Sequence, residues 1–271
     1  MKIKQEWINE SKINSERYTS LYKESIEDND KFWNEQGNRI DWYEKYTKIK
    51  NTKYSNKDVN IKWYEDGKLN VSYNCIDRHA RQNPDRVAII WEGDEPGDTK
   101  KITYKELLLN VSKASNILKK IGIKKGDIVT IYLTMIPELA YIMLACARIG
   151  AIHSIIFGGF SAESIAGRIK DCGSKYIITA NEGIRGGKKI PLKLTVDQAL
   201  ESCSEVKKCL IIKRTSKEIE LKLNRDIVYE DLINDVQDFC EPEVLNAEDP
   251  LFILYTSGST GKPKGVMHTS G

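Results

Sequence analysis

Apolar residues follow two different spacings along most of this chain. Short apolar runs, which are typical of buried strands, alternate with stretches in which apolar residues recur every three or four positions, as in helices. The strands expected from the short runs are 87–91, 128–133, 152–157, 176–180, 210–212 and 251–255, and the helices expected between them are 103–120, 137–149, 162–172 and 192–203. This alternation predicts an α/β fold, in which flanking helices cover a mostly parallel sheet.

Three local signals support the helix boundaries. Thr103 and Glu106 have the spacing of a capping box, which satisfies free amides at a helix start. Pro137 suits the first turn of the next helix. Gly173 follows the apolar period that ends at Cys172, and glycine is the preferred residue just after a helix.

The first 75 residues lack this alternation. They are rich in aromatic residues and predict an irregular, mainly helical region, with a hairpin over Asn60–Val71 that turns at Asp66-Gly67. We therefore expect two parts: an N-terminal region, 1–75, and an α/β domain, 76–271.

Composition excludes several classes of function. The 271 residues are 40% hydrophobic and 30% charged, and the net charge of +3 is too small to indicate a nucleic-acid partner. No stretch is apolar for long enough to cross a bilayer, and the first residues lack the apolar core of a signal peptide, so a cytoplasmic location is expected. The six cysteines form no Cys-x-x-Cys pair and the three histidines lie far apart, so no metal site is expected.

The segment Tyr255–Gly265 carries the strongest candidate chemistry. Glycines let backbone amides converge on an anion, hydroxyls donate hydrogen bonds, and lysines add positive charge. The candidate residues for binding a polyphosphate are Thr256, Ser257, Gly258, Ser259, Thr260, Gly261, Lys262 and Lys264. The order of residues is not that of a Walker A loop, because Pro263 stands where that motif has Ser or Thr and disfavours a helix starting directly after Lys262. The competing interpretation is a flexible polar turn.

This segment resembles the phosphate-binding loop of the adenylate-forming superfamily. Further segments narrow the resemblance to AMP-forming acetyl-coenzyme A synthetases, from roughly Tyr18 to the last residue: 60–67 (NIKWYEDG), 88–94 (AIIWEGD), 143–150 (MLACARIG), 152–160 (IHSIIFGGF) and 246–271. The resemblance implies a ligase that joins acetate to coenzyme A through acetyl-AMP, releasing AMP and pyrophosphate. It also implies ATP with Mg²⁺ and coenzyme A as the small molecules bound.

The same resemblance implies a coenzyme A site in two glycine-rich segments. The first comprises Phe157, Gly158 and Gly159, whose glycines would equally suit a tight turn. The second is the expected loop 182–189, with Arg185, Gly186, Gly187 and Lys188. Lys188 stands where the family has a second arginine; lysine keeps the charge but lacks the planar fork of a guanidinium.

The adenine and acyl motifs and the catalytic lysine of the family would follow Gly271, so the resemblance implies a fragment that is inactive alone. Three alternatives stay open: a propionyl-CoA synthetase fragment, half of a split enzyme completed by a C-terminal chain, or a nucleotide- or coenzyme A-binding module. We also expect the strand Leu251–Tyr255 to be buried on both faces in an intact fold, and to form an unprotected sheet edge here, prone to aggregation.

Overall fold

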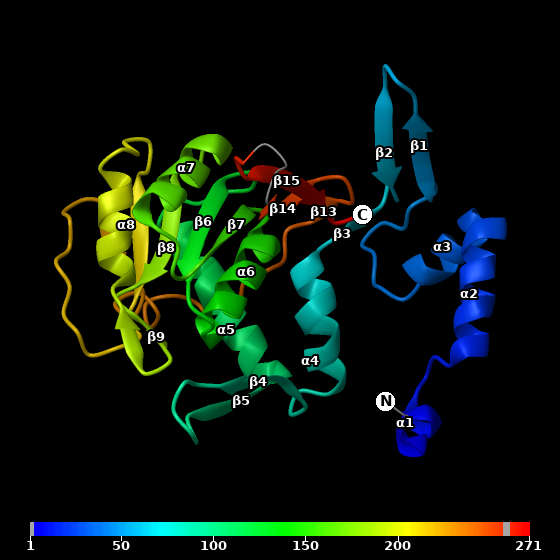
Figure 1. Ribbon diagram of the computed structural model, residues 1–271, viewed down its shortest axis with the longest axis horizontal. Helices are drawn as coiled ribbons and strands as arrows, with labels where there is room; N and C mark the ends of the chain where they lie inside the picture. Colours follow the sequence, from blue (N-terminus) through cyan, green and yellow to red (C-terminus); the bar gives the residue numbers. More distant parts are fainter. Residues whose placement is uncertain (1–2, 257–260) are drawn as a thin grey trace.

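The computed structural model of this protein describes residues 3–256 and 261–271. A sheet at the centre of this part has seven strands in the order β12-β11-β8-β6-β7-β14-β15 (Figure 1). Their bounds are β6 (Ile128–Leu133), β7 (Ile152–Phe157), β8 (Tyr176–Ala180), β11 (Lys208–Ile212), β12 (Asp226–Val228), β14 (Pro250–Thr256) and β15 (Lys264–Thr269). All neighbouring strands pair in parallel except β14 and β15. The α/β class and the mostly parallel sheet are therefore confirmed.

Helices pack in two pairs against this sheet. They are α5 (Tyr104–Lys120), α6 (Pro137–Ile149), α7 (Ala162–Cys172) and α8 (Leu192–Leu200). The chain crosses from β6 to β7 in one direction and from β7 back past β6 to β8 in the other, so right-handed crossovers put α6 and α7 on opposite faces. α5 contacts α6, and α7 contacts α8. The layers between helices and sheet contain the fully buried Ile131, Ile142, Ile165, Ile177 and Leu210.

The local signals behave as the sequence predicts. Thr103 accepts from the amide of Glu106, and the Glu106 carboxylate accepts from the amide of Thr103, so the capping box is formed. Gly173 follows α7 with φ 68°, a left-handed conformation that favours glycine. The bounds of α6 and α7 are those expected, whereas α8 ends at Leu200, earlier than the expected Cys203.

The strand expected at 87–91 is β4 (Val87–Glu92), but it lies outside the central sheet. It pairs antiparallel with β5 (Thr99–Thr103), which the apolar pattern did not reveal because three of its five residues, Thr99 to Lys101, are exposed and polar. β4 carries Trp91, and the connection to β5 carries Asp98, toward the site described below.

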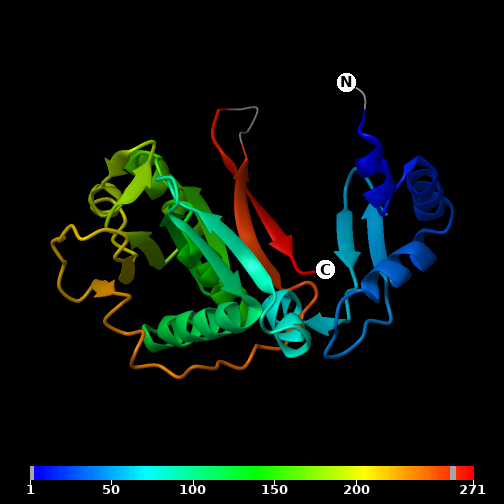
Figure 2. The ribbon, with the colours of Figure 1, turned by 90° about the horizontal axis from the view of Figure 1, so that it is seen from below.

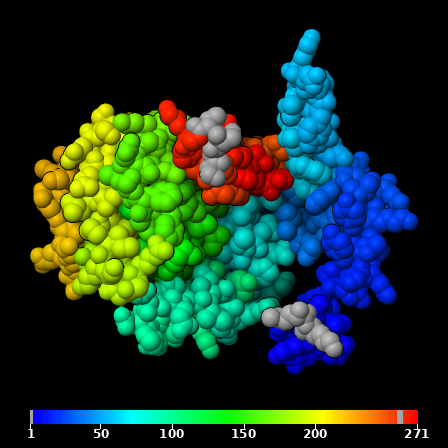
Figure 3. All heavy atoms as spheres, viewed as in Figure 1, coloured from blue at the N-terminus to red at the C-terminus, as the bar shows by residue number. Residues whose placement is uncertain are grey.

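In the described part of the chain, eight N-terminal elements precede β4, and the first five of them lie to one side of the sheet (Figure 2). They are α1 (Gln5–Glu10), α2 (Ser15–Glu27), α3 (Asn29–Gly37), β1 (Lys50–Tyr54), β2 (Val59–Trp63), β3 (Lys68–Leu69), the π-helix η1 (Tyr73–Asp77) and α4 (Arg78–Gln82). The hairpin of β1 and β2 projects from the surface (Figure 3).

The hairpin expected over Asn60–Val71 is wrong. β2 pairs with β1, while β3 pairs with β13 (Leu245–Asn246) from the other end of the chain. A turn does form at Asp66, whose carboxylate accepts from the amides of Thr47 (2.9 Å) and Lys48 (3.0 Å). The turn signal was right, but long-range pairing chose different partners for the strands that flank it.

The unprotected edge expected at Leu251–Tyr255 is also wrong. β14 is an internal strand, because β7 pairs with one side of it and β15 with the other. Within this chain Ile253 is 6% exposed and Leu254 is 46% exposed, and the burial expected in an intact fold stays a prediction. The chain returns as β15 and pairs with β14, so β15 forms the edge of the described sheet.

Candidate functional site

The candidate residues gather at one edge of the central sheet. β6, β7, β8 and β14 run in parallel, so their carboxyl ends lie along the same edge. Open α/β sheets bind ligands in the crevice outside these ends. The segments after β7, β8 and β14 are those in which the sequence places candidate site residues.

The glycines after β7 serve close packing and backbone conformation. A Cβ added to Gly158 would lie 2.8 Å from the backbone oxygen of Leu133, and Gly159 has φ 139°. The hydroxyl of Tyr132 accepts from the amide of Gly159 (3.1 Å) and donates to the carbonyl of Phe160 (2.9 Å). Burial raises the pKa of Tyr132, so the hydroxyl keeps the proton that this second bond needs.

The segment 182–189 was expected to be a loop and is instead part of a hairpin. β9 (Gly183–Arg185) pairs with β10 (Lys188–Ile190), and Gly186 and Gly187 turn between them with φ 56° and 70°. Positive φ at both turn residues is the conformation that twists with the strands, and glycine adopts it without strain. Asp94 accepts from the amides of Gly186 (2.9 Å) and Gly187 (2.6 Å), which lower the pKa of its carboxyl.

A cavity of about 370 Å³ opens between these segments. Its lining residues are Trp91, Glu92, Gly93, Asp94, Leu133, Thr134, Met135, Ile136, Phe157, Gly158, Ile184, Arg185 and Arg214. The Arg185 guanidinium lies over the Phe157 ring, 5.2 Å from its centroid. Phe157, Gly158 and Arg185 are thus brought together, while Gly159, Gly186, Gly187 and Lys188 are outside the lining set that the described residues form.

Sequence reasoning identified as candidates only three of the thirteen described lining residues, namely Phe157, Gly158 and Arg185. Trp91 and Met135 are joined by a hydrogen bond from the indole Nε1 to the Met135 carbonyl (2.7 Å). Arg214 lines the same cavity and lies over the Trp91 ring. The segment 88–94 was noticed only for its resemblance, and Arg214 stands in a charged stretch with no motif. Trp91 lies within β4, whereas Arg214 lies two residues after β11, and this position at a strand end was the signal that could have found Arg214.

The candidate phosphate-binding segment joins two antiparallel strands, β14 and β15. Thr256, the last residue of β14, is the register partner of Lys264, the first of β15. A strand rather than a helix follows Pro263, which confirms that the loop is not built like a Walker A motif. Gly261 has φ 82°, and Lys262 is exposed. The candidates Ser257, Gly258, Ser259 and Thr260 lie outside the described residues.

Arg168 of α7 connects the two candidate sites. Its guanidinium lies 4.8 Å from the ring centroid of Phe160 and 5.3 Å from that of Tyr255. The Tyr255 hydroxyl donates to Asp171 (2.6 Å), and burial together with this bond raises the pKa of Tyr255. The loop after β7 and the start of the phosphate loop are therefore packed against the same side chain.

Metal-binding clusters and membrane-spanning helices are both absent from the described residues. Residues 3–256 and 261–271 contain no group of three or more His, Cys, Asp or Glu side chains placed to hold a metal ion. None of the helices in that part of the chain is long and apolar enough to span a membrane.

Comparison with protein families agrees with this architecture. The model of the family described as AMP-binding enzyme matches residues 76–271. The chain belongs to the AMP-binding enzyme family. A second family model, described as acetyl-coenzyme A synthetase N-terminus, matches residues 18–75.

Individual relatives narrow the similarity. The chain is 55% identical over 266 residues to acetyl-coenzyme A synthetase from Parvibaculum lavamentivorans, covering 98% of this chain and 41% of that protein. It is 58% identical over 263 residues to the acetyl-coenzyme A synthetase of Brucella canis, covering 96% of this chain and 40% of that protein. The solved structure of acetoacetyl-CoA synthetase from Streptomyces lividans superposes with a TM-score of 0.83 at 23% identity, over 98% of this chain and 41% of that one, which shows a shared fold. The chain thus spans about two fifths of these relatives' length.

Proposed function

We propose that this chain forms part of an AMP-forming acetate–CoA ligase, which converts acetate, ATP and coenzyme A to acetyl-CoA, AMP and pyrophosphate through acetyl-AMP. The observation that carries the proposal is the 55–58% identity, over nearly the whole chain, to proteins named acetyl-coenzyme A synthetase. Since the chain spans about two fifths of these relatives, we assign to it only contacts with ATP phosphates and with coenzyme A.

In this proposal the β14–β15 connection holds the phosphates of ATP. Where β14 ends and β15 begins, Thr256 supplies a hydroxyl, and Lys262 and Lys264 supply two positive charges. Gly261 supplies a left-handed turn between the strands. Attack of acetate on the α-phosphate builds up negative charge on phosphate oxygens, and positioned cationic donors stabilise that charge. Mg²⁺ would accompany ATP and share this work; the described residues offer it no ligand cluster, and we assign it none.

The cavity beside Arg185 is proposed to receive coenzyme A. Its wall of Phe157 and Arg185 offers an aromatic face and a cation to a ligand that carries a nucleobase and phosphates. Arg185 is exposed at the end of β9, so its guanidinium is available to an anion. The pairing of aromatic surface with a few polar groups is typical of a small-molecule site.

Replacing Arg185 with alanine tests the coenzyme A site. A hydrogen bond to a charged group contributes about 1.5–3 kcal/mol, so the variant should bind coenzyme A roughly 10- to 100-fold more weakly. Isothermal titration of the chain with coenzyme A measures this. Lys189→Ala, an exposed position on the same hairpin, is the control and should bind like the wild type. Absence of binding by the wild-type chain would refute the assignment.

Lys264→Ala tests the phosphate loop, in a full-length acetyl-coenzyme A synthetase that carries residues 255–265 of this chain. Lys264 is fixed by its pairing with Thr256, so its removal should lower ATP affinity or turnover roughly ten- to hundredfold. Lys262→Ala should cost less, because Lys262 lies in the turn before β15 and lacks the strand pairing that holds the backbone of Lys264. Acetate-dependent pyrophosphate exchange is the assay. Equal and negligible effects at both positions would favour a simple polar turn.

A further inference from the structure

The segment between β11 and β12, residues 213–225, reaches the same cavity and is anchored at both ends. At its start Asn181, only 2% exposed, binds the segment through both side-chain polar atoms. Its amide nitrogen donates to the carbonyls of Thr215 (2.8 Å) and Lys217 (2.9 Å). Its oxygen accepts from the amides of Arg214 (2.9 Å) and Thr215 (3.2 Å). The backbone of Arg214 is therefore held in place.

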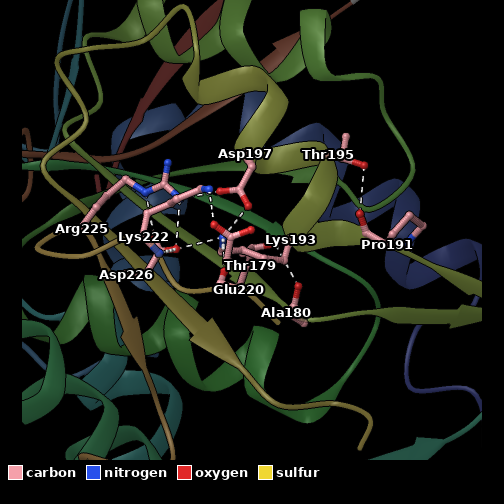
Figure 4. Close-up of polar contacts among 10 residues, drawn as sticks. All are labelled: Thr179, Ala180, Pro191, Lys193, Thr195, Asp197, Glu220, Lys222, Arg225 and Asp226. Carbon is pink, nitrogen blue, oxygen red and sulfur yellow. Dashed lines mark hydrogen bonds and ion pairs between the residues drawn. The ribbon is translucent and has the colours of Figure 1, made fainter. Parts of the chain in front are cut away.

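The far end of the segment is held by an ion cluster against α8. Figure 4 shows Lys193 and Asp197 of α8 converging with Arg225 and Asp226. Lys193 Nζ lies 2.6 Å from Asp197 Oδ2 and 2.9 Å from Asp226 Oδ2, and Arg225 pairs with both carboxylates. The Lys193 side chain is 3% exposed and that of Asp226 is 0% exposed, so the contacts are shielded from water. A segment fixed at both ends presents its side chains in a defined arrangement.

The side chain of Arg214 lies against the cavity wall. Its guanidinium carbon is 5.2 Å from the centroid of Trp91, whose indole is oriented by its bond to Met135. One nitrogen, Nη2, donates to Asp98 (3.2 Å). A guanidinium has five N–H donors, so one such bond leaves the remaining donors for a ligand. The Asp98 side chain is 39% exposed, so water screens its pairing with Arg214.

The cavity therefore contains two similar arginine–aromatic pairs. Arg185 lies over Phe157 and Arg214 lies over Trp91, each at 5.2 Å. Both arginines line the same space of about 370 Å³, and Lys188 is not among the described lining residues. Of the acidic groups in the wall, Asp94 already accepts two backbone amides. Two guanidinium groups on aromatic rings fit a ligand in which phosphates adjoin a planar base.

We propose that Arg214, stacked on Trp91, is a second anion-binding residue of this cavity and contacts the phosphates in the nucleotide part of coenzyme A. The inference rests on the proposed function of the cavity as the coenzyme A site. It assigns the second guanidinium of the site to a segment far from the glycine-rich hairpin, and makes Arg214 a determinant of specificity for phosphorylated ligands. Arg214 and Arg185 come from different segments of the chain and together offer the ligand two guanidinium groups.

Titration calorimetry of the whole chain with three ligands tests this inference: coenzyme A, 3′-dephospho-coenzyme A and adenosine. Arg214→Gln should weaken coenzyme A binding by roughly 10- to 100-fold. It should change adenosine binding by less than about twofold, because adenosine carries no phosphate for the guanidinium to contact. A smaller loss for the dephospho compound than for coenzyme A would place the contact at the 3′-phosphate, and an equal loss would place it at the diphosphate. Lys207→Gln, exposed and just before β11 at the opposite end of the strand, is the matched control and should leave all three affinities unchanged.

The outcomes separate the two proposals. If the wild-type chain binds none of the ligands, the coenzyme A site itself is refuted. If Arg185→Ala weakens coenzyme A binding but Arg214→Gln does not, the site stands and the role of Arg214 is overturned. Equal weakening of coenzyme A and adenosine would show that Arg214 only shapes the wall, and would also overturn it. Should Arg214→Gln fail to fold, Arg214→Lys keeps the charge without the planar fork and should give an intermediate loss for coenzyme A alone.

Discussion

Replacing Asp226 with asparagine is expected to lower the free energy of unfolding by about 3–5 kcal/mol, the usual cost of removing one partner from a buried ion pair. The carboxylate is 0% exposed and accepts from Lys193 (2.9 Å), Arg225 Nε (2.6 Å) and the amide of Lys222 (2.9 Å). When Asp226 loses its charge, Asp197 is the one carboxylate in the described cluster that still pairs with Lys193 and Arg225. Urea unfolding followed by circular dichroism measures the change.

The matched control is Glu220→Gln, in the same segment. Glu220 pairs with Lys222 at 2.6 Å, but the two side chains are 80% and 50% exposed. An exposed pair contributes at most about 1 kcal/mol, so this variant should unfold close to the wild type. A loss at Asp226 no larger than that at Glu220 would show that the buried cluster does not stabilise the fold.

The same cluster predicts sensitivity to strong acid. Burial disfavours the charged form of Asp226, but the bonds from Arg225, Lys222 and Lys193 outweigh it, and the net pKa is lowered. A carboxyl whose pKa is lower in the folded chain than its ordinary value of 3.8 stabilises the fold above that value. The contribution is then lost as the pH falls below about 4, and Asp226→Asn should lack this loss.

Mild acid is expected to act earlier, through His153, with a loss of about 3 kcal/mol between pH 6.5 and pH 4. Burial lowers the pKa of His153 from 6.5 to about 4, and the residue is 5% exposed in β7. Between these two values the unfolded chain binds a proton that the folded chain does not. Stability is therefore greatest above pH 6.5 and falls as the pH drops toward 4.

His153→Phe should remove this dependence while keeping the packing. His153 stacks on Phe252 of β14 at 5.5 Å, and its Nδ1 finds no hydrogen-bond partner among the described residues. A phenyl ring can occupy the same stack without titrating. Free energies of unfolding at pH 7, 5.5 and 4 for the two chains give the test, because carboxyl groups contribute equally to both. Parallel pH profiles for the wild type and the variant would refute the role of His153.

Features of the fold that depend on residues close together in the sequence could be predicted, and features that depend on distant residues could not. The bounds of α6 and α7 were predicted correctly, because the signals that set them are local. An apolar period, Pro137 and Gly173 each affect the conformation of residues only a few positions away. The hairpin over Asn60–Val71 was wrong because β3 found its partner, β13, some 175 residues away. Nothing near β3 encodes that choice, which depends on where the rest of the chain places a free strand edge.

The candidate site shows the same division. Glycine-rich segments after β7 and β14 were recognisable, because glycine is required where the backbone turns left-handed or approaches another strand closely, as Gly158 does. Trp91 and Arg214 were not recognisable. A tryptophan and an arginine 123 positions apart carry no joint signal until β4 and the segment after β11 are folded against one cavity.

By itself, the sequence determined the α/β class, the order of the helices and strands of the central sheet up to β11, and the chemistry available in the phosphate loop, because these follow from spacing and residue type. Only the tertiary structure decided that β14 lies inside the sheet and that Arg185 and Arg214 face one cavity. It also decided that Lys193 and Asp226 are buried together. Each of these depends on contacts between distant segments, whose energies arise only when the chain has closed the loops between them.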